Sequence, residues 1–459
     1  MRGDKMQKYL KRQIYNRFLM WKNQSERSTL EVSGARQVGK TYIVKKFADE
    51  QYASQIYVNL LEFSGELFLS QYHKLWSEME SGFICENPVH ELIKRYYPNF
   101  VDDINTVVII DEIQESPEIY NRIREFTRNL KSDFIITGSY LGRILNKEFK
   151  YSSGDLDSIE IQTLSYEEFL LAMDKQDLYA KLDLYSNSDE SVYEELNQLY
   201  DIYTTIGGYP AVVLKYLATH SIEECSSTLL KIIKLFINES KRYFEDILDN
   251  EVYDNIFSCV ARLLVREKKG FDKDSFSEEL QKIVVRDYSS KIGKATINRA
   301  IDWLYSSGII GFAGKVTDCN ILDFQTKARC YFMDVGLTYY FLTHIGCADS
   351  DINGIISENF VFLNLRNRMN PPSEIALEMP AFATLGQGEI DFFVKTLKSK
   401  KTYAIEVKAG RGNSKTMKMV LEKQKADYIL YAKGNTKGGQ KDNIYTIPIY
   451  GIDKFKFEC

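Results

Sequence analysis

The stretch GARQVGKT, residues 34–41, decides the fold. An apolar run, Leu30–Ser33, leads into it, and Ile43, Val44 and Phe47 follow it at helical spacing. The stretch satisfies G-x-x-x-x-G-K-[ST] in the strand–loop–helix setting that this motif requires. The sequence therefore predicts a phosphate-binding loop, or P-loop, at the start of an α/β fold.

The residue types of this loop suit a nucleoside triphosphate. Gly34 and Gly39 allow a tight turn that points N–H groups at phosphate oxygens, and the following helix adds its N-terminal dipole. Lys40 brings positive charge to the β- and γ-phosphates, and Thr41 brings a hydroxyl ligand for Mg²⁺. We expect ATP to contact Gly34, Ala35, Arg36, Gln37, Val38, Gly39, Lys40, Thr41 and Tyr42.

An acid pair ends a second apolar strand, because Thr106–Ile110 leads directly into Asp111 and Glu112. At that position Asp111 can hold Mg²⁺ through water, while Glu112 can orient and deprotonate an attacking water. The pair favours hydrolysis of ATP over phosphoryl transfer to a small acceptor, so a P-loop kinase is the minor alternative.

Two further apolar runs, Ile56–Leu60 and Phe134–Thr137, alternate with helical patterns, as in a parallel sheet. The second run continues into Gly138 and Ser139. A polar side chain there can sense the γ-phosphate, and Thr137 and Ser139 are equal candidates for this contact.

Helical spacing continues to about residue 250, broken by GGYP at 207–210. Two helical stripes, within 276–284 and 297–304, then precede a β-rich stretch, which is the order of a winged helix. Off the second stripe, Thr296, Asn298 and Arg299 could face DNA, whereas Asp302 would repel phosphate. Contact with DNA and structural packing both stay open for this helix.

The stretch GEIDFFVKTLKSKKTYAIEVKAG, residues 388–410, holds two strand-like runs joined by a lysine-rich turn. Period-2 alternation puts Asp391 on one face with Glu389 and Phe393, opposite Ile390, and gathers Glu406 and Lys408 on one face of the second run. Asp391 and Glu406 can supply oxygen ligands to Mg²⁺, and Lys408 can activate water or neutralise phosphate charge. Glu358, on the buried face of a preceding helix, needs a partner or a metal and is a further candidate ligand.

This arrangement resembles the core of the PD-(D/E)xK nucleases, where an Asp near one strand's end is followed by Glu-x-Lys on the next. The resemblance implies a catalytic role for Asp391, Glu406 and Lys408, and metal binding by Glu358, Asp391 and Glu406. No proline precedes Asp391, unlike the family pattern. Three interpretations stay open: an active metal-dependent phosphodiesterase, a nuclease fold kept for binding, and a solvated hairpin without a role.

Charge is unevenly distributed. The net charge of −5 argues against a protein that binds nucleic acid over most of its surface. Residues 395–441, however, hold thirteen Lys and Arg against three acids (Glu406, Glu422 and Asp427), a local balance of +10. This region could meet nucleic-acid phosphates or form an ordinary solvated surface.

The seven cysteines are scattered and the histidines number four, which argues against a structural zinc site and fits reduced thiols in the cytosol. Near the N-terminus, Leu10, Ile14, Phe18 and Trp21 recur at helical spacing, as in a docking helix rather than a signal peptide. No apolar run approaches the roughly 18 residues of a membrane span. We therefore expect a cytoplasmic protein without a membrane segment.

Several motifs occur in a fixed order: RQIYNRFLMWKN, GARQVGKT, VVIIDEIQ, FIITGS, GGYP, KARCYFMDVGL and the 388–408 stretch. In this the chain resembles, over nearly its whole length, the bacterial and archaeal AAA-type ATPases that carry a nuclease-like C-terminal domain. The resemblance implies a role for Arg36 in the phosphate loop and a contact of Pro210 with the adenine. For the GGYP turn, an equal alternative is a purely structural break between helices. No arginine finger is evident, so assembly into a homo-oligomer stays open.

Together these observations predict an α/β fold. It comprises a P-loop NTPase parallel sheet, a helical lid, a winged-helix domain and a C-terminal restriction-endonuclease-like α/β domain. The expected boundaries are 1–165, 166–250, 251–340 and 341–459. The leading hypothesis is an ATPase whose nucleotide state gates a nuclease-like domain acting on nucleic acid. The alternative is a regulatory ATPase whose terminal domains only bind DNA or protein partners.

Overall fold

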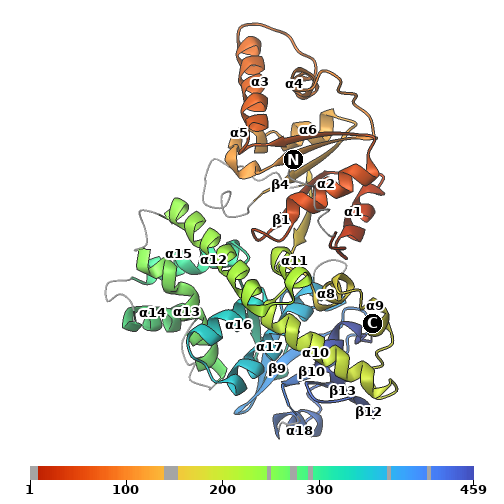
Figure 1. Ribbon diagram of the computed structural model, residues 1–459, viewed down its shortest axis with the longest axis vertical. Helices are drawn as coiled ribbons and strands as arrows, with labels where there is room; N and C mark the ends of the chain where they lie inside the picture. Colours follow the sequence, from red (N-terminus) through yellow and green to blue (C-terminus); the bar gives the residue numbers. More distant parts are fainter. Residues whose placement is uncertain are drawn as a thin grey trace. The chain divides into compact units, whose positions relative to one another are not determined.

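The computed structural model describes residues 9–138, 154–244, 250–268, 276–287, 293–369, 374–410 and 415–458. The chain folds as two compact units, and many of their elements are labelled in Figure 1. We call Lys11–Gln162 the P-loop unit, and Met1–Leu10 with Thr163–Cys459 the C-terminal unit. No helix in these ranges combines the length and the apolarity that crossing a lipid bilayer requires.

The P-loop unit is built on a parallel sheet with the strand order β2-β3-β4-β1-β5. Its strands are β1 (Thr29–Gly34), β2 (Ser54–Asn59), β3 (Thr106–Asp111), β4 (Asp133–Thr137) and β5 (Leu156–Ile161). The first four confirm the strands expected from apolar runs. The sequence did not single out β5, because only Ile159 and Ile161 of this edge strand are buried and its apolar signal is weak.

Helices and turns of the P-loop unit follow the strands in alternation, as the pattern predicted. They are α1 (Tyr15–Lys22), α2 (Lys40–Gln51), α3 (Phe63–Glu80), α4 (Pro88–Tyr96), η1 (Ile113–Glu115), α5 (Pro117–Tyr120) and α6 (Ile123–Asn129).

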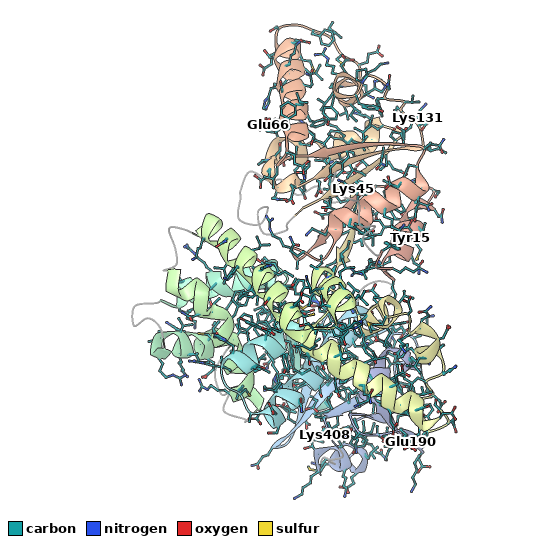
Figure 2. The ribbon with its side chains drawn as sticks, viewed as in Figure 1. Tyr15, Lys45, Glu66, Lys131, Glu190 and Lys408 are labelled. Atoms are coloured by element: carbon teal, nitrogen blue, oxygen red, sulfur yellow. The ribbon has the colours of Figure 1, made fainter. Side chains whose placement is uncertain are left out.

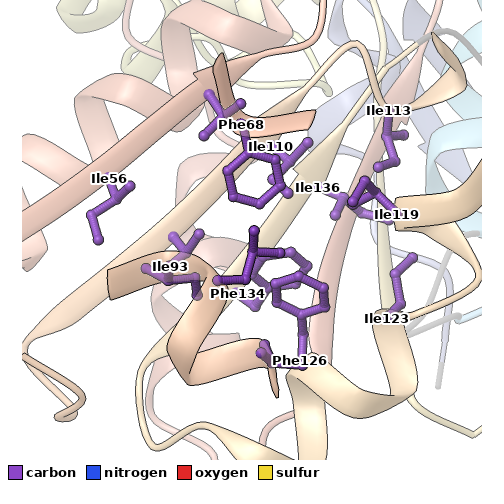
Figure 3. Close-up of a cluster of buried hydrophobic side chains, with 14 of the residues drawn as sticks. Ile56, Phe68, Ile93, Ile110, Ile113, Ile119, Ile123, Phe126, Phe134 and Ile136 are labelled. Atoms are coloured by element: carbon purple, nitrogen blue, oxygen red, sulfur yellow. The ribbon is translucent and has the colours of Figure 1, made fainter. Parts of the chain in front are cut away.

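An apolar cluster holds the sheet of this unit in place (Figure 3). Ile110 of β3 and Ile136 of β4 are fully buried against Phe68 of α3, and the rings of Phe126 and Phe134 stack with centroids 4.3 Å apart. Burying a side chain of this size stabilises the fold by about 1.5–3 kcal/mol. The cluster thereby fixes the carboxyl ends of β3 and β4, where the polar residues of the motifs lie.

The C-terminal unit begins with helices, as expected. They are α8 (Tyr166–Ala172), α9 (Gln176–Ala180), α10 (Glu190–Ile206), α11 (Pro210–Thr219), α12 (Ile222–Phe244), α13 (Asn250–Lys268), α14 (Phe276–Asp287) and α15 (Lys294–Ser306). Later helical elements are η2 (Thr317–Cys319), α16 (Val335–His344), α17 (Asp349–Met369), α18 (Lys415–Glu422) and η3 (Ile449–Lys454).

Among the described residues of this unit, eight strands form a mixed sheet in the order β12-β13-β11-β10-β9-β8-β6-β7. The strands are β6 (Ile310–Val316), β7 (Phe324–Phe332), β8 (Ala381–Leu385), β9 (Gly388–Lys395), β10 (Thr402–Lys408), β11 (Tyr428–Lys433), β12 (Gly439–Lys441) and β13 (Ile444–Pro448). The elements α13, α14, α15, β6 and β7 follow one another in the order that was expected for a winged helix. However, β6 pairs in parallel with β8, so its hairpin belongs to the same sheet as the strands after the expected boundary at 340.

The hairpin predicted within 388–408 is present as β9 and β10, which pair antiparallel. One detail of the prediction is wrong. Ile390 and Phe393, which strict alternation places on opposite faces, pack in one apolar cluster with Ala404. A register shift between β8 and β9 explains this, because Ala381 pairs with Phe393 whereas Ala383 pairs with Ile390. Such a bulge bends the strand and redirects its side chains.

Candidate functional site

The P-loop turns between β1 and α2 through two glycines in the left-handed region. Gly34 has a φ of +138° and Gly39 a φ of +91°, values that side chains rarely allow. A Cβ on Gly34 would also collide with the carbonyl oxygen of Ile161 on the adjacent strand β5. Both motif glycines are therefore required by the local backbone.

Lys40 begins α2 and its ammonium lies over the loop. Nζ donates hydrogen bonds to the carbonyl oxygens of Gly34 at 3.0 Å and Ala35 at 2.8 Å. The helix has Gly39 as its N-cap, a residue without a side chain that could cap the first N–H groups. These N–H groups and the lysine charge together form a site suited to an anion.

Thr41 and Asp111 are brought together from positions 70 residues apart in the sequence. Thr41 Oγ1 donates to Oδ2 of Asp111 at 2.7 Å. The phenol of Tyr57 donates to the same oxygen at 2.7 Å, and the backbone N–H of Glu112 donates to Oδ1 at 2.9 Å. These three donors stabilise a carboxylate that is only 2% exposed.

Tyr57 was missed by the sequence analysis. It lies on β2, where Asn59 pairs with Asp111 of β3. Burial, and then the hydrogen bond to Asp111, raise the pKa of its phenol well above the ordinary value, so it acts as a donor throughout the physiological range. The available signal was its alternation with the buried residues Ile56 and Val58.

Glu112 sits in a left-handed conformation, with φ +56° and ψ +43°. This conformation is uncommon for a residue other than glycine and marks local strain. Its carboxylate accepts a hydrogen bond from Nε2 of Gln114 at 2.5 Å. A Cβ on Gly138 would collide with the side chain of Gln114, so the glycine after β4 leaves room for this contact.

Thr137 ends β4, which lies between the P-loop strand β1 and the acid-pair strand β3. Its residue is 1% exposed, and its Oγ1 has no hydrogen-bond partner among the described residues. Ser139, the equal candidate from the sequence, lies outside the described residues. Of the two candidates for sensing a phosphate, only the surroundings of Thr137 can therefore be given.

The other expected loop residues vary in placement. Val38 is buried and Tyr42 is exposed, while Gln37 adopts a φ of +64°. Arg36 is half-buried. Sequence analysis missed Arg12, whose guanidinium donates to the carbonyl oxygens of Val38 at 3.0 Å and Gln162 at 2.6 Å and so braces the loop against the segment after β5.

Pro210 begins α11 in the C-terminal unit. The preceding glycines are held by specific contacts: the N–H of Gly208 donates to Oδ2 of Asp334 at 2.8 Å, and its carbonyl accepts from the N–H of Leu164 at 2.7 Å. A Cβ on Gly207 would collide with Oδ1 of Asp334. These contacts account for the Gly-Gly pair structurally and join the GGYP and MDVGL motifs.

The acidic residues of the β9–β10 hairpin lie close together. Asp391, at the bulge of β9, accepts a hydrogen bond through Oδ2 from the N–H of Val407 at 2.7 Å. On either side of Val407, the carboxylate of Glu406 and the ammonium of Lys408 form an ion pair of 2.5 Å. Oε2 of Glu406 is buried without a hydrogen-bond partner among the described residues.

Glu358 is held differently from the expected metal ligand. Its Oε1 accepts hydrogen bonds from Nη1 of Arg329 at 3.1 Å and from the phenol of Tyr331 at 2.5 Å. Nη2 of Arg329 also pairs with Glu389 at 2.7 Å. A small cavity of about 140 Å³ is lined by Glu358 and Asp391, together with Leu264, Glu267, Arg329, Tyr331, Ile355 and Glu389.

Within the described ranges, no three His, Cys, Asp or Glu side chains gather closely enough to hold a metal ion. Glu358 already has a cationic partner in Arg329, so the expected three-carboxylate metal set does not fit. The Thr41–Asp111 pair fits Mg²⁺ better, because this ion needs few protein oxygens when phosphates and water complete its shell.

Comparison with known proteins bears on both units. Residues 26–170 match the family described as an AAA domain, and residues 197–346 match a domain of unknown function (DUF8612). No curated protein matches the chain. The AAA match and the loop geometry support a P-loop ATPase of the AAA type.

Three solved structures are similar at low identity. The ORC2 protein of Aeropyrum pernix, in ADPNP–ADP complexes, is 12% identical, with a TM-score of 0.28 over 72% of this chain and 90% of that chain. The ORC1 protein of Aeropyrum pernix in complex with DNA is 10% identical, with a TM-score of 0.29 over 72% and 91%. Cdc6p of Pyrobaculum aerophilum is 9% identical, with a TM-score of 0.26 over 77% and 97%. With TM-scores this low, they carry no inference about this chain.

Proposed function

We propose that the P-loop unit binds ATP with Mg²⁺ and hydrolyses it. The observation that carries this proposal is the 2.7 Å hydrogen bond between Thr41 and Asp111, beside the Lys40 ammonium in the loop. Thr41 and Asp111 would hold Mg²⁺, which would neutralise charge on the β- and γ-phosphates. Lys40 and the N-terminus of α2 bind the phosphate oxygens.

Glu112 is the proposed general base. Gln114 orients its carboxylate, and the adjacent Asp111 is held in place by three donated hydrogen bonds. A carboxylate in this position accepts a proton from the attacking water. Thr137 and Ser139 are the proposed γ-phosphate contacts, and Tyr57 positions Asp111.

The direct test is release of inorganic phosphate from ATP by the full chain with Mg²⁺. Lys40→Ala should abolish turnover, because it removes the positive charge from the phosphate site. Lys46→Ala, on the same helix but paired at the surface with Glu50, is the matched control and should retain turnover. Equal turnover in the parent and Lys40→Ala would overturn the assignment.

For the C-terminal unit, we propose that nucleotide state governs its contact with nucleic acid. The basic region 395–441 and the Asp391, Glu406 and Lys408 set support this proposal. The Arg329–Glu358 pair favours binding over metal-dependent cleavage, since it occupies a carboxylate that cleavage was expected to use.

Cleavage by Asp391, Glu406 and Lys408 is the second candidate function, favoured by their joint position around Val407. An assay on DNA and RNA with Mg²⁺ or Mn²⁺ and ATP separates the two. Nicking that disappears in Asp391→Ala would establish cleavage. Binding that persists in Asp391→Ala, with an intact substrate in the parent, would establish the binding role.

A further inference from the structure

An open groove lies at the carboxyl end of β11 in the C-terminal unit, with a volume of about 980 Å³. One part of its lining comes from α10, and another comes from the end of β11 and the segment that follows it. It is lined by Tyr193, Glu194, Asn197, Gln198, Lys433, Gly434, Asn435, Thr436, Lys437, Thr446 and Tyr450. Its volume falls in the range of sites that bind molecules rather than single ions, about 300–1,000 Å³.

The lining of the groove is polar and weakly basic. It offers the amides of Asn197, Gln198 and Asn435 and two ammonium groups, Lys433 and Lys437, against a single carboxylate. Its aromatic rings belong to the framework, since the phenol of Tyr450 donates to the backbone oxygen of Tyr193 at 3.0 Å. A ligand here would therefore meet amide donors and acceptors and positive charge.

The segment after β11 is anchored at both ends. The N–H of Gly434 donates to the carbonyl oxygen of Lys408 at 2.9 Å, and a Cβ on Gly434 would collide with the carbonyl oxygen of Ala409. At the other end, the carbonyl oxygen of Gly438 accepts from the hydroxyl of Ser186 at 2.8 Å. The wall that carries Asn435 and Lys437 is therefore built into the fold rather than loosely attached.

The groove also adjoins the Glu406–Lys408 pair. Strands β10, β11 and β13 run parallel, with Lys408 paired to Lys433 and Lys433 paired to Pro448 in the register. Ligands of α/β sheets commonly bind outside the carboxyl ends of parallel strands. Burial, and then the charge of Lys408, lower the pKa of Lys433, which is consistent with two closely spaced cations at this edge.

We propose that this groove binds the phosphate backbone of a single-stranded nucleic acid and leads it to the Glu406–Lys408 pair. Lys433 and Lys437 contact phosphates, and Asn197, Gln198 and Asn435 contact the edges of unpaired bases. This proposal rests on the proposed function only in that the C-terminal unit contacts nucleic acid. It requires neither ATP hydrolysis nor cleavage.

A single strand suits this lining better than a duplex. Amide side chains form hydrogen bonds with base edges, which a single strand exposes and a duplex confines to its grooves. Charged grooves that follow one backbone are the usual device of proteins that bind single strands. The ion pair of Lys437 with Glu190, whose side chain is 67% exposed, is weak enough to exchange for a phosphate.

The test is fluorescence anisotropy of a labelled single-stranded DNA oligonucleotide with the full chain at low salt. The groove variant Lys433→Ala/Lys437→Ala should weaken binding about tenfold or more, and Asn435→Ala, at an exposed position, should weaken it without changing net charge. The slope of log Kd against log salt should fall by about 0.7 for each phosphate that the variant no longer neutralises. Figure 2 labels Lys408, which pairs with Lys433 in the strand register, and Glu190, the ion-pair partner of Lys437.

The matched control is Lys398→Ala/Lys441→Ala, which removes the same charge from exposed positions of the same basic region. An equal loss of affinity in this control would overturn the proposal in favour of a diffuse basic surface. The proposal would also be overturned if the parent bound duplex DNA as tightly as the single strand, or did not bind the single strand at all. Displacement of the labelled strand by poly-glutamate as readily as by the unlabelled strand would overturn it too. In the absence of ATP, the parent and Lys40→Ala should bind the oligonucleotide equally, and ATP turnover is measured on the same preparations, so failure of the ATPase and failure of the groove are distinguishable.

Discussion

The hydroxyl of Thr41 donates a 2.7 Å hydrogen bond to the carboxylate of Asp111, although the two residues are 70 positions apart. This contact joins the first turn of α2 to the end of β3 and defines where Mg²⁺ would bind. Thr41 can contribute through the packing of its side chain and through the hydrogen bond of its hydroxyl, and substitutions can distinguish these two contributions.

Thr41→Val keeps the shape of the side chain but removes its hydroxyl. We expect ATP turnover to fall about 10- to 100-fold, because a hydrogen bond to a charged group is worth about 1.5–3 kcal/mol. The Mg²⁺ concentration for half-maximal turnover should rise. Thr41→Ser, which keeps the hydroxyl, is the control, and equal Mg²⁺ dependence in both variants would contradict the assigned role.

Removing Arg329 should destabilise the C-terminal unit. Its guanidinium, with a side chain 12% exposed, is paired with Glu358, whose side chain is 6% exposed. Breaking such a pair from one side costs about 3–5 kcal/mol, because a buried charge is left without its partner. Arg329→Met should therefore lower the Tm of this unit in calorimetry.

The double variant Arg329→Met/Glu358→Gln tests whether the destabilisation comes from the pair itself. It should recover part of the Tm decrease that Arg329→Met causes, since no charge is then stranded at position 358. Strictly additive changes in Tm would show that the two side chains do not interact.

Asp453 should make stability depend on pH. Burial raises the pKa of its carboxyl from 3.8 to about 6, against the opposing charge of Arg368. Because the folded state then binds the proton more tightly, this contribution is fully present below about pH 4 and is lost as pH rises through about 6. Asp453→Asn should remove this slope and raise stability at pH 7 by up to about 3 kcal/mol.

To check the pH prediction, the Tm of the C-terminal unit is measured between about pH 4 and pH 8 in Asp453→Asn and in the parent. The profile of the parent is then subtracted from that of the variant. Asp442→Asn, at an exposed position of the same unit, is the control. An unchanged pH slope in Asp453→Asn would contradict the raised pKa.

Gly207→Ala tests the structural account of the GGYP turn. Gly207 and Gly346 have nearly equal φ angles, +77° and +72°, but only at Gly207 would a Cβ collide with a neighbour, Asp334. Gly346→Ala should cost about 1 kcal/mol for backbone strain alone. Gly207→Ala should cost clearly more, both from the collision with Asp334 and because its ψ of −172° is a backbone conformation essentially restricted to glycine, and equal differences in Tm would refute the proposed fit.

The P-loop unit could be predicted from the sequence because its signals are local. Val107–Ile110 is continuously apolar and is followed at once by Asp111, so both the strand and its polar end are visible in five consecutive residues. Tyr57 and Arg12 were not visible, because their roles depend on partners brought close by the fold.

The C-terminal unit was harder to predict because its decisive contacts join distant residues. Alternation in 388–395 correctly indicated a strand, yet the bulge at β9 depends on pairing with β8. Glu358 was recognised as a buried acid in need of a partner, but the partner, Arg329, comes from β7 and carries no sequence signal of its own.

The central claim is tested most directly by measuring both ATP affinity and ATP turnover in Glu112→Gln. We expect turnover to fall about 10²- to 10⁴-fold through removal of the general base. ATP affinity should stay within about twofold, since Lys40, Thr41 and Asp111 are intact. Glu118→Gln, an exposed residue on α5, should leave both unchanged. Full turnover in Glu112→Gln would contradict hydrolysis by the acid pair.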